Sequence, residues 1–200
     1  MPSKPSAEIQ FCAAPPAPGG EPSDWVRRFA ALLREGASVL DLAAGGGRHA
    51  RWLAERGCRV TAVDRDAAAL ATMKGVAGIE TRVLDLEGPD WPLDGEHFDA
   101  VVVANCLYRP RFPALFALVR PGGLLIYETF MLGNERFGKP SNPDFLLRPC
   151  ELLDCLPEGW SVVAFEQGEV ERPAVIQRLC AMRRTAPGRL PSLAWPRTSP

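Results

Sequence analysis

The chain has 200 residues, of which 46% are hydrophobic and 24% are charged, and its formal net charge is −1. A charge so close to zero excludes the general electrostatic attraction behind binding to nucleic acid or an anionic membrane surface. No apolar run reaches the ~18 residues of a spanning helix, and the first residues lack an apolar signal core, so we expect a cytoplasmic protein. Two histidines and no Cys-x-x-Cys pair give no basis for a metal site.

Composition divides the chain into three parts. Proline, alanine and glycine dominate residues 1–20, and four prolines fall in the last fifteen residues. Segments of this kind rarely bury enough apolar surface to fold. We therefore expect a flexible lead over 1–20, one folded domain over 21–184 and a Pro-rich tail over 185–200.

Hydrophobic periodicity predicts alternating helices and strands. In chain order these are a helix over 24–34, a strand over 38–42, a helix over 47–56, a strand over 59–64, a helix over 66–74, strands over 80–84 and 98–104, a helix over 113–119, a strand over 124–129, a helix over 149–155 and strands over 161–167 and 175–183. This alternation predicts an α/β fold with a single Rossmann-like, seven-stranded, mostly parallel sheet. The last two strands follow each other through a turn and add an antiparallel C-terminal edge strand.

Ligands of such sheets bind at the carboxyl ends of the strands. Polar side chains gather at those ends here: Asp41, Asp64, Asp85 and Asn105 lie at or just after the first four strands. The first strand also runs directly into a glycine-rich turn that opens a helix. Such a junction lets a ligand lie against bare backbone at a helix N-terminus.

The glycine turn leaves two cofactors open. Gly45, Gly47 and Ala50 satisfy Gly-x-Gly-x-x-Ala, and Asp64 follows at a distance suited to a ribose, which fits an NAD(P)-dependent oxidoreductase. Against this, Asp41 stands four residues before the first glycine, where a buried carboxylate would repel a pyrophosphate. Its carboxylate could instead face a cationic ligand group or accept backbone N–H bonds in the turn.

An adenosine with a cationic amino-acid tail satisfies more of these positions. Asp64 can accept two ribose hydroxyls, and Asp85 can accept from an exocyclic amine while the Leu86 N–H donates to a ring nitrogen. S-adenosylmethionine is such a ligand. Its ammonium suits Asp41 or carbonyls near Ala43.

At these residues the chain resembles the class I S-adenosylmethionine-dependent methyltransferases. The matching stretches are the glycine motif 39–47, Val63-Asp64, Asp85-Leu86, Phe98-Asp99 and Arg120-Pro121-Gly122-Gly123, and together they span about residues 36–130. One departure is Ala43, which replaces the first glycine of the usual motif. The resemblance implies a cofactor site made of Asp41, Ala43, Gly45, Gly47, Arg48, Asp64, Arg65, Asp85, Leu86 and Asn105, with Arg48 or the helix-end N–H groups holding the carboxylate of the cofactor.

Within that superfamily the chain is most similar to the small tellurite-resistance and thiopurine methyltransferases. The similar segments are 47–57, which begins Gly-Arg-His-Ala, and 151–160, which ends Glu-Gly-Trp. The resemblance implies in-line transfer of a methyl group to a small-molecule or metalloid acceptor. Catalysis of this kind mainly requires positioning of two partners, so we name no catalytic residue.

Four residues are candidates for the acceptor side: Tyr108, Arg109, Glu128 and Arg136. They lie at or after the carboxyl ends of the fourth and fifth strands, where the acceptor side of the sheet is expected. Besides the oxidoreductase, a non-catalytic module that only binds S-adenosylmethionine remains an alternative. Binding measurements with S-adenosylhomocysteine and NADH distinguish the methyltransferase from the oxidoreductase, and failure to methylate any acceptor despite binding would indicate the module.

Overall fold

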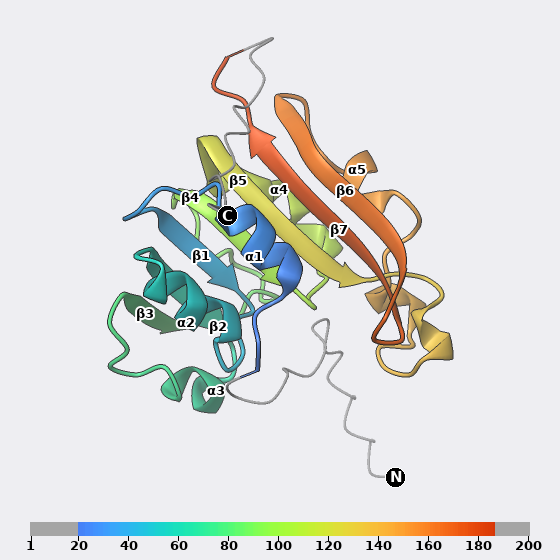
Figure 1. The fold of residues 1–200 in the computed structure, drawn as a ribbon, viewed down its shortest axis with the longest axis horizontal. Coiled ribbons are helices and arrows are strands. Elements are labelled where there is room, and N and C mark those ends of the chain that lie inside the picture. Colours follow the sequence, from blue (N-terminus) through green and yellow to red (C-terminus); the bar gives the residue numbers. More distant parts are fainter. Residues whose placement is uncertain (1–19, 187–200) are drawn as a thin grey trace, which may run out of the picture.

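Seven strands form one sheet in the computed structural model of this protein, which describes residues 20–186 (Figure 1). From one edge to the other they are β3 (Ile79–Val83), β2 (Arg59–Asp64), β1 (Ser38–Leu42), β4 (Phe98–Ala104), β5 (Val119–Phe130), β7 (Ala174–Arg183) and β6 (Trp160–Val170). The flexible lead predicted over 1–20 and the Pro-rich tail predicted over 185–200 lie outside the described residues, except for residues 20, 185 and 186.

The sheet contains both parallel and antiparallel strands, as predicted. Strands β3, β2, β1, β4 and β5 are parallel, and β7 is antiparallel to both of its neighbours, β5 and β6. The mostly parallel Rossmann-like architecture with antiparallel C-terminal strands is thus confirmed. The hairpin folds back so that β7, the last strand of the chain, pairs with β5, and β6 forms the edge.

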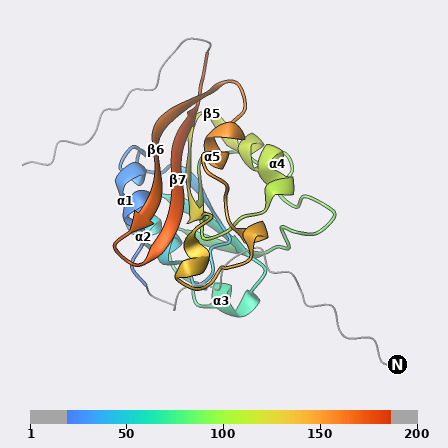
Figure 2. The same cartoon turned by 90° about the vertical axis from the view of Figure 1, so that its right-hand side faces the viewer.

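Helices cover both faces of the sheet (Figure 2). The helices α1 (Asp24–Ala30), α2 (Arg48–Glu55) and α3 (Ala67–Ala71) pack on one face, and α4 (Phe112–Ala117) and α5 (Glu151–Asp154) pack on the other. Three short 3₁₀ turns complete the description, namely η1 (Arg109–Arg111), η2 (Asn134–Arg136) and η3 (Pro143–Phe145). Strand β4 carries buried apolar side chains on both faces, as a central parallel strand should.

Several helices end earlier than the periodicity predicted. After α1, the Leu32 and Leu33 N–H groups donate to the carbonyls of Phe29 and Ala30, each at 3.0 Å. After α3, the Met73 N–H donates to the Leu70 carbonyl at 2.9 Å. These bonds span three residues instead of four, so the last predicted turn of each helix is a tighter turn that still buries its apolar side chains.

In the described residues, no helix has the length and apolar character needed to cross a membrane.

Candidate functional site

The turn between β1 and α2 is built from three left-handed residues. Ala43, Gly45 and Gly47 have φ angles of 58°, 52° and 76°. Such angles are open to glycine and unfavourable for alanine, so Ala43 adopts the conformation of the glycine it replaces at a cost of about 1–2 kcal/mol. At Gly47 there is a second reason for glycine, because an added Cβ would lie 1.8 Å from the Met73 Sδ.

Asp64, the last residue of β2, is bonded to this turn. Its Oδ2 accepts the Gly45 N–H at 2.8 Å, and its Oδ1 accepts the Asp66 N–H at 2.9 Å. A carboxylate oxygen has two acceptor positions, so each oxygen keeps one for a ligand. The bonds fix the carboxylate in place before any ligand arrives.

Asp41 lies under the turn and is only 1% exposed. Its carboxylate accepts the Ala50 N–H in the first turn of α2, a helix whose first-cap residue, Gly47, has no side chain to do so. The sequence left two partners open for Asp41, a cationic ligand group or backbone N–H groups, and this bond corresponds to the second.

The surroundings of Asp41 leave buried polar atoms without partners. His49 Nδ1 lies 4.0 Å from the Asp41 Oδ1, while Asp41 Oδ2 and His49 Nε2 have no hydrogen bond within residues 20–186. Burial raises the pKa of Asp41 to about 7 and lowers the pKa of His49 to about 3. The imidazole is therefore neutral at pH 7, and the 4.0 Å contact is not an ion pair.

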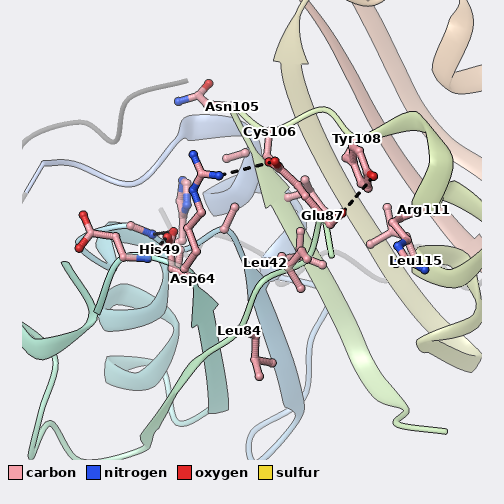
Figure 3. Close-up of a pocket in the computed structure, with 18 of the residues that line it drawn as sticks. Leu42, His49, Asp64, Leu84, Glu87, Asn105, Cys106, Tyr108, Arg111 and Leu115 are labelled. Carbon is pink, nitrogen blue, oxygen red and sulfur yellow. Dashed lines mark hydrogen bonds and ion pairs between the residues drawn. The ribbon is translucent and has the colours of Figure 1, made fainter. Parts of the chain in front are cut away.

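A cleft opens above the turn at the carboxyl ends of β1, β2, β3 and β4 (Figure 3). It brings together most of the residues proposed for the cofactor. Its lining includes Ala43, Gly45, Gly47, Arg48, Asp64, Arg65, Asp85, Leu86, Asn105 and Tyr108. Asp41 does not line it, because its side chain points into the α2 face of the sheet beneath the turn.

One wall of the cleft is apolar and comes largely from residues that the sequence analysis did not single out. Leu84, Trp91, Val103, Leu115 and Tyr127 line it. These side chains read as ordinary core in the sequence, and only the fold turns them toward a ligand.

Tyr127 holds the chain after β4 in place. Its hydroxyl donates to the Cys106 carbonyl at 2.7 Å, and its ring meets that of Phe112 edge-on. Complete burial raises the pKa of this hydroxyl well above its usual range, so it remains a donor.

The mouth of the cleft is partly closed by the segment 85–91. The Arg65 guanidinium lies 3.5 Å from the Glu87 carboxylate, and the Tyr108 hydroxyl donates to the Glu87 carbonyl at 3.3 Å (Figure 3). Arg111 donates to the carbonyls of Pro89 and Asp90 at 3.0 and 3.2 Å. Residues on either side of the cleft thus hold this segment.

Three acceptor-side candidates lie outside the cleft wall. Arg109 donates to the Glu151 carboxylate at 2.5 and 2.9 Å and joins η1 to α5. Arg136 is largely exposed and lies 3.5 Å from Glu169. Glu128 borders the cleft without lining it, since its strand neighbour Ala104 belongs to the lining.

Comparison with known proteins gives a consistent picture. Residues 39–123 match the family model of the methyltransferase domain. The chain is 33% identical over 139 residues to the ubiquinone biosynthesis O-methyltransferase of Alkalilimnicola ehrlichii, covering 62% of this chain and 52% of that protein. The chain spans about half the length of the curated relatives it matches.

Solved structures share the fold. TehB from Haemophilus influenzae has a TM-score of 0.66 at 20% identity, covering 80% of this chain and 61% of that chain. The N-methyltransferase NodS from Bradyrhizobium japonicum has a TM-score of 0.62 at 18% identity, covering 80% of this chain and 92% of that chain. These relatives lend no support to the oxidoreductase alternative.

Proposed function

We propose that this chain, whose residues 39–123 match the family model of the methyltransferase domain and whose fold is shared by solved S-adenosylmethionine-dependent methyltransferases, transfers a methyl group from S-adenosylmethionine to a small molecule. One observation carries the proposal. At adjacent strand ends the cleft brings together the glycine turn, Asp64, which is placed to bind a ribose, and Asp85, which lies beside the apolar wall.

The residues present suit the parts of that cofactor. Asp64 keeps one acceptor position on each oxygen for the ribose hydroxyls, and Asp85 and Leu86 border the apolar wall on which an adenine would lie. Arg48, at the start of α2, is a cleft-lining cation suited to a carboxylate, and its Nη1 also donates to the Glu21 carbonyl at 3.1 Å. The buried Asp41 carboxyl beneath the turn has an unpartnered Oδ2, and when this group is ionised its negative charge favours a cationic tail over a pyrophosphate.

When bound, S-adenosylmethionine supplies an electrophilic methyl group activated by its sulfonium. The protein's task is to hold the acceptor in line with that group and to exclude water. The segment 85–91, held by Arg65, Tyr108 and Arg111, supplies part of the water exclusion.

Isothermal titration with S-adenosylhomocysteine and with NADH tests the cofactor assignment. We expect saturable binding of the first and none of the second. Tight NADH binding without a response to S-adenosylhomocysteine would refute the proposal. A protein that binds the cofactor product yet forms none of it from S-adenosylmethionine with thiols, amines, phenols, selenite or tellurite would be a binding module instead.

A further inference from the structure

A ladder of alternating charges crosses the α1 face of the sheet and ends beside the cleft. Glu166 of β6, Arg178 of β7 and Glu128 of β5 are direct cross-strand neighbours. Arg178 lies 3.1 Å from Glu128 and 3.5 Å from Glu166, and Arg28 of α1 lies 3.1 Å from Glu166. The outer members are half-exposed, whereas Glu128 is only 8% exposed.

Glu128 lies next to the cleft. Its carbonyl accepts the N–H of Asn105, a cleft residue held at φ 56°, and its strand partner Ala104 also lines the cleft. On the other side, Arg48 lines the cleft and lies within electrostatic range of the Glu128 carboxylate, which counteracts the lowering of the Arg48 pKa by burial. The main chain of Glu128 therefore lies at the end of β4 beside the cleft, and its carboxylate lies on the α1 face within electrostatic range of Arg48.

The two oxygens of Glu128 differ. Oε2 accepts from the Arg178 Nε at 3.1 Å. Oε1 has no hydrogen-bond partner in residues 20–186, and it is not among the buried unpartnered atoms of that range, so it is accessible. A carboxylate held by one oxygen and open at the other is prepared to accept a hydrogen bond from a small molecule.

Most of the arginines near the cleft are already engaged, and the exception is Arg172, which lies within electrostatic range of Arg48. Arg111 is bound by backbone carbonyls, Arg109 by Glu151, and Arg178 by the ladder itself. Arg48 is the one assigned to the carboxylate of the cofactor. An oxyanion acceptor such as tellurite would thus meet an accessible carboxylate oxygen beside cations that mostly have partners of their own, which disfavours it.

We propose that Glu128 accepts a hydrogen bond from the nucleophile of the methyl acceptor, and that the acceptor is an amine or a hydroxyl compound and not an oxyanion. This inference rests on the proposed function. In the transfer, the nitrogen or oxygen bonds to the methyl carbon, and the carbon–sulfur bond breaks with its electron pair left on sulfur. The proton of the nucleophile passes to Glu128 Oε1 and then to water.

Isothermal titration of the protein saturated with S-adenosylhomocysteine tests the inference. The probes are three acceptor classes: benzylamine and ethanolamine, catechol and phenol, and selenite and tellurite. We expect at least one amine or phenol to bind saturably and neither oxyanion to do so. Glu128→Gln should weaken that binding at least tenfold while leaving S-adenosylhomocysteine affinity within twofold.

Glu166→Gln is the matched control, because Glu166 contacts the same arginine but lies away from the cleft. It should leave probe binding unchanged. If Glu128→Gln does not fold, Glu128→Asp keeps the charge and withdraws the oxygens by one methylene, and the same weakening is expected.

The inference is overturned by saturable binding of an oxyanion, by absence of binding of all amines and phenols, or by equal effects of the Glu128 and Glu166 variants. Loss of S-adenosylhomocysteine binding by the unmodified protein would instead refute the proposed function. The first titration, made before any probe is added, separates the two failures.

Discussion

The Asp64 carboxylate accepts the Gly45 N–H at 2.8 Å, so the end of β2 is bonded directly to the turn that follows β1. The same carboxylate accepts the Asp66 N–H at 2.9 Å. Two backbone bonds orient an acid that lies in the cleft, where it is proposed to meet the ribose of the cofactor. Preorganisation of this kind removes the entropy loss that a mobile side chain would suffer on binding.

Replacing Asp64 with alanine should weaken S-adenosylhomocysteine binding by about 1–3 kcal/mol, roughly 5- to 150-fold in Kd, because charged hydrogen bonds to the ligand and the turn are lost. Isothermal titration measures the change. Asp94→Ala, which removes an exposed carboxylate from the loop before β4, is the control and should leave Kd unchanged. An Asp64 variant with unaltered affinity would place this residue outside the site.

Much of this arrangement follows from local sequence. Helices alternate with strands, and the strands end at acids or in a glycine turn, so the parallel arrangement and a ligand site at the strand ends could be predicted. The helix ends could not be predicted, since the tight turns after α1 partly bury the same apolar side chains, Leu32 and Leu33, that a further helical turn would cover. Periodicity cannot distinguish the two.

Contacts between residues far apart in the sequence could not be predicted either. Arg109 follows β4 and so lies at the correct end of the sheet for an acceptor site. Its partner Glu151 is 42 positions further along the chain, and no local pattern links them. The apolar wall of the cleft was not predicted for a related reason. Val103 and Tyr127 occupy strand positions that are typical of the core, and only the fold shows that they line the cleft.

Gly47→Ala should destabilise the domain beyond the effect of a left-handed backbone alone. Its Cβ would meet the Met73 sulfur, whereas Gly75, at φ 80°, has nothing within 4 Å. We expect Gly75→Ala to lower the free energy of unfolding by about 1–2 kcal/mol and Gly47→Ala by a further ~1–3 kcal/mol from overpacking. Urea denaturation measures both.

A double-mutant cycle with Met73→Ala isolates the clash. Shortening Met73 should recover part of the loss in the Gly47 variant, with a coupling of ~0.5–3 kcal/mol. Strict additivity of the two substitutions would show that crowding at this position is not the cause.

Asp41 should make stability depend on pH. Its pKa is raised from 3.8 to about 7 in the folded protein, so its contribution to stability is fully present below pH 3.8 and is lost as the pH rises through 7. The loss has an upper bound of about 4 kcal/mol. His49 acts in the opposite direction, because its pKa falls from 6.5 to about 3 and its contribution is lost as the pH falls below 6.5.

Asp41→Asn separates the two groups, since asparagine carries no charge and can still accept the Ala50 N–H. The free energy of unfolding of the variant, measured relative to that of the unmodified protein, should increase between pH 5 and pH 8. Urea denaturation at both pH values gives this difference. A difference that is constant with pH would mean that Asp41 titrates alike in the folded and unfolded chains.

Arg109→Ala should reduce stability without altering cofactor affinity. The guanidinium holds the buried Glu151 carboxylate and the Leu146 carbonyl, the latter at 2.7 Å, so its removal leaves a buried charge with fewer partners. We expect a loss of ~2–3 kcal/mol, less than the ~3–5 kcal/mol of a fully buried pair, because the Arg148 N–H still donates to Glu151 at 2.7 Å.

Arg136→Ala is the matched control for this experiment. Its side chain is 61% exposed and pairs with Glu169 at the surface, so the loss in stability should stay below about 1 kcal/mol. Adding Glu151→Gln to the Arg109 variant should restore part of the stability, because the unpaired buried charge is then gone. Thermal unfolding follows stability and titration with S-adenosylhomocysteine follows binding. If Arg109→Ala left stability intact and weakened ligand binding instead, Arg109 would be a binding residue and its bonds to Glu151 incidental.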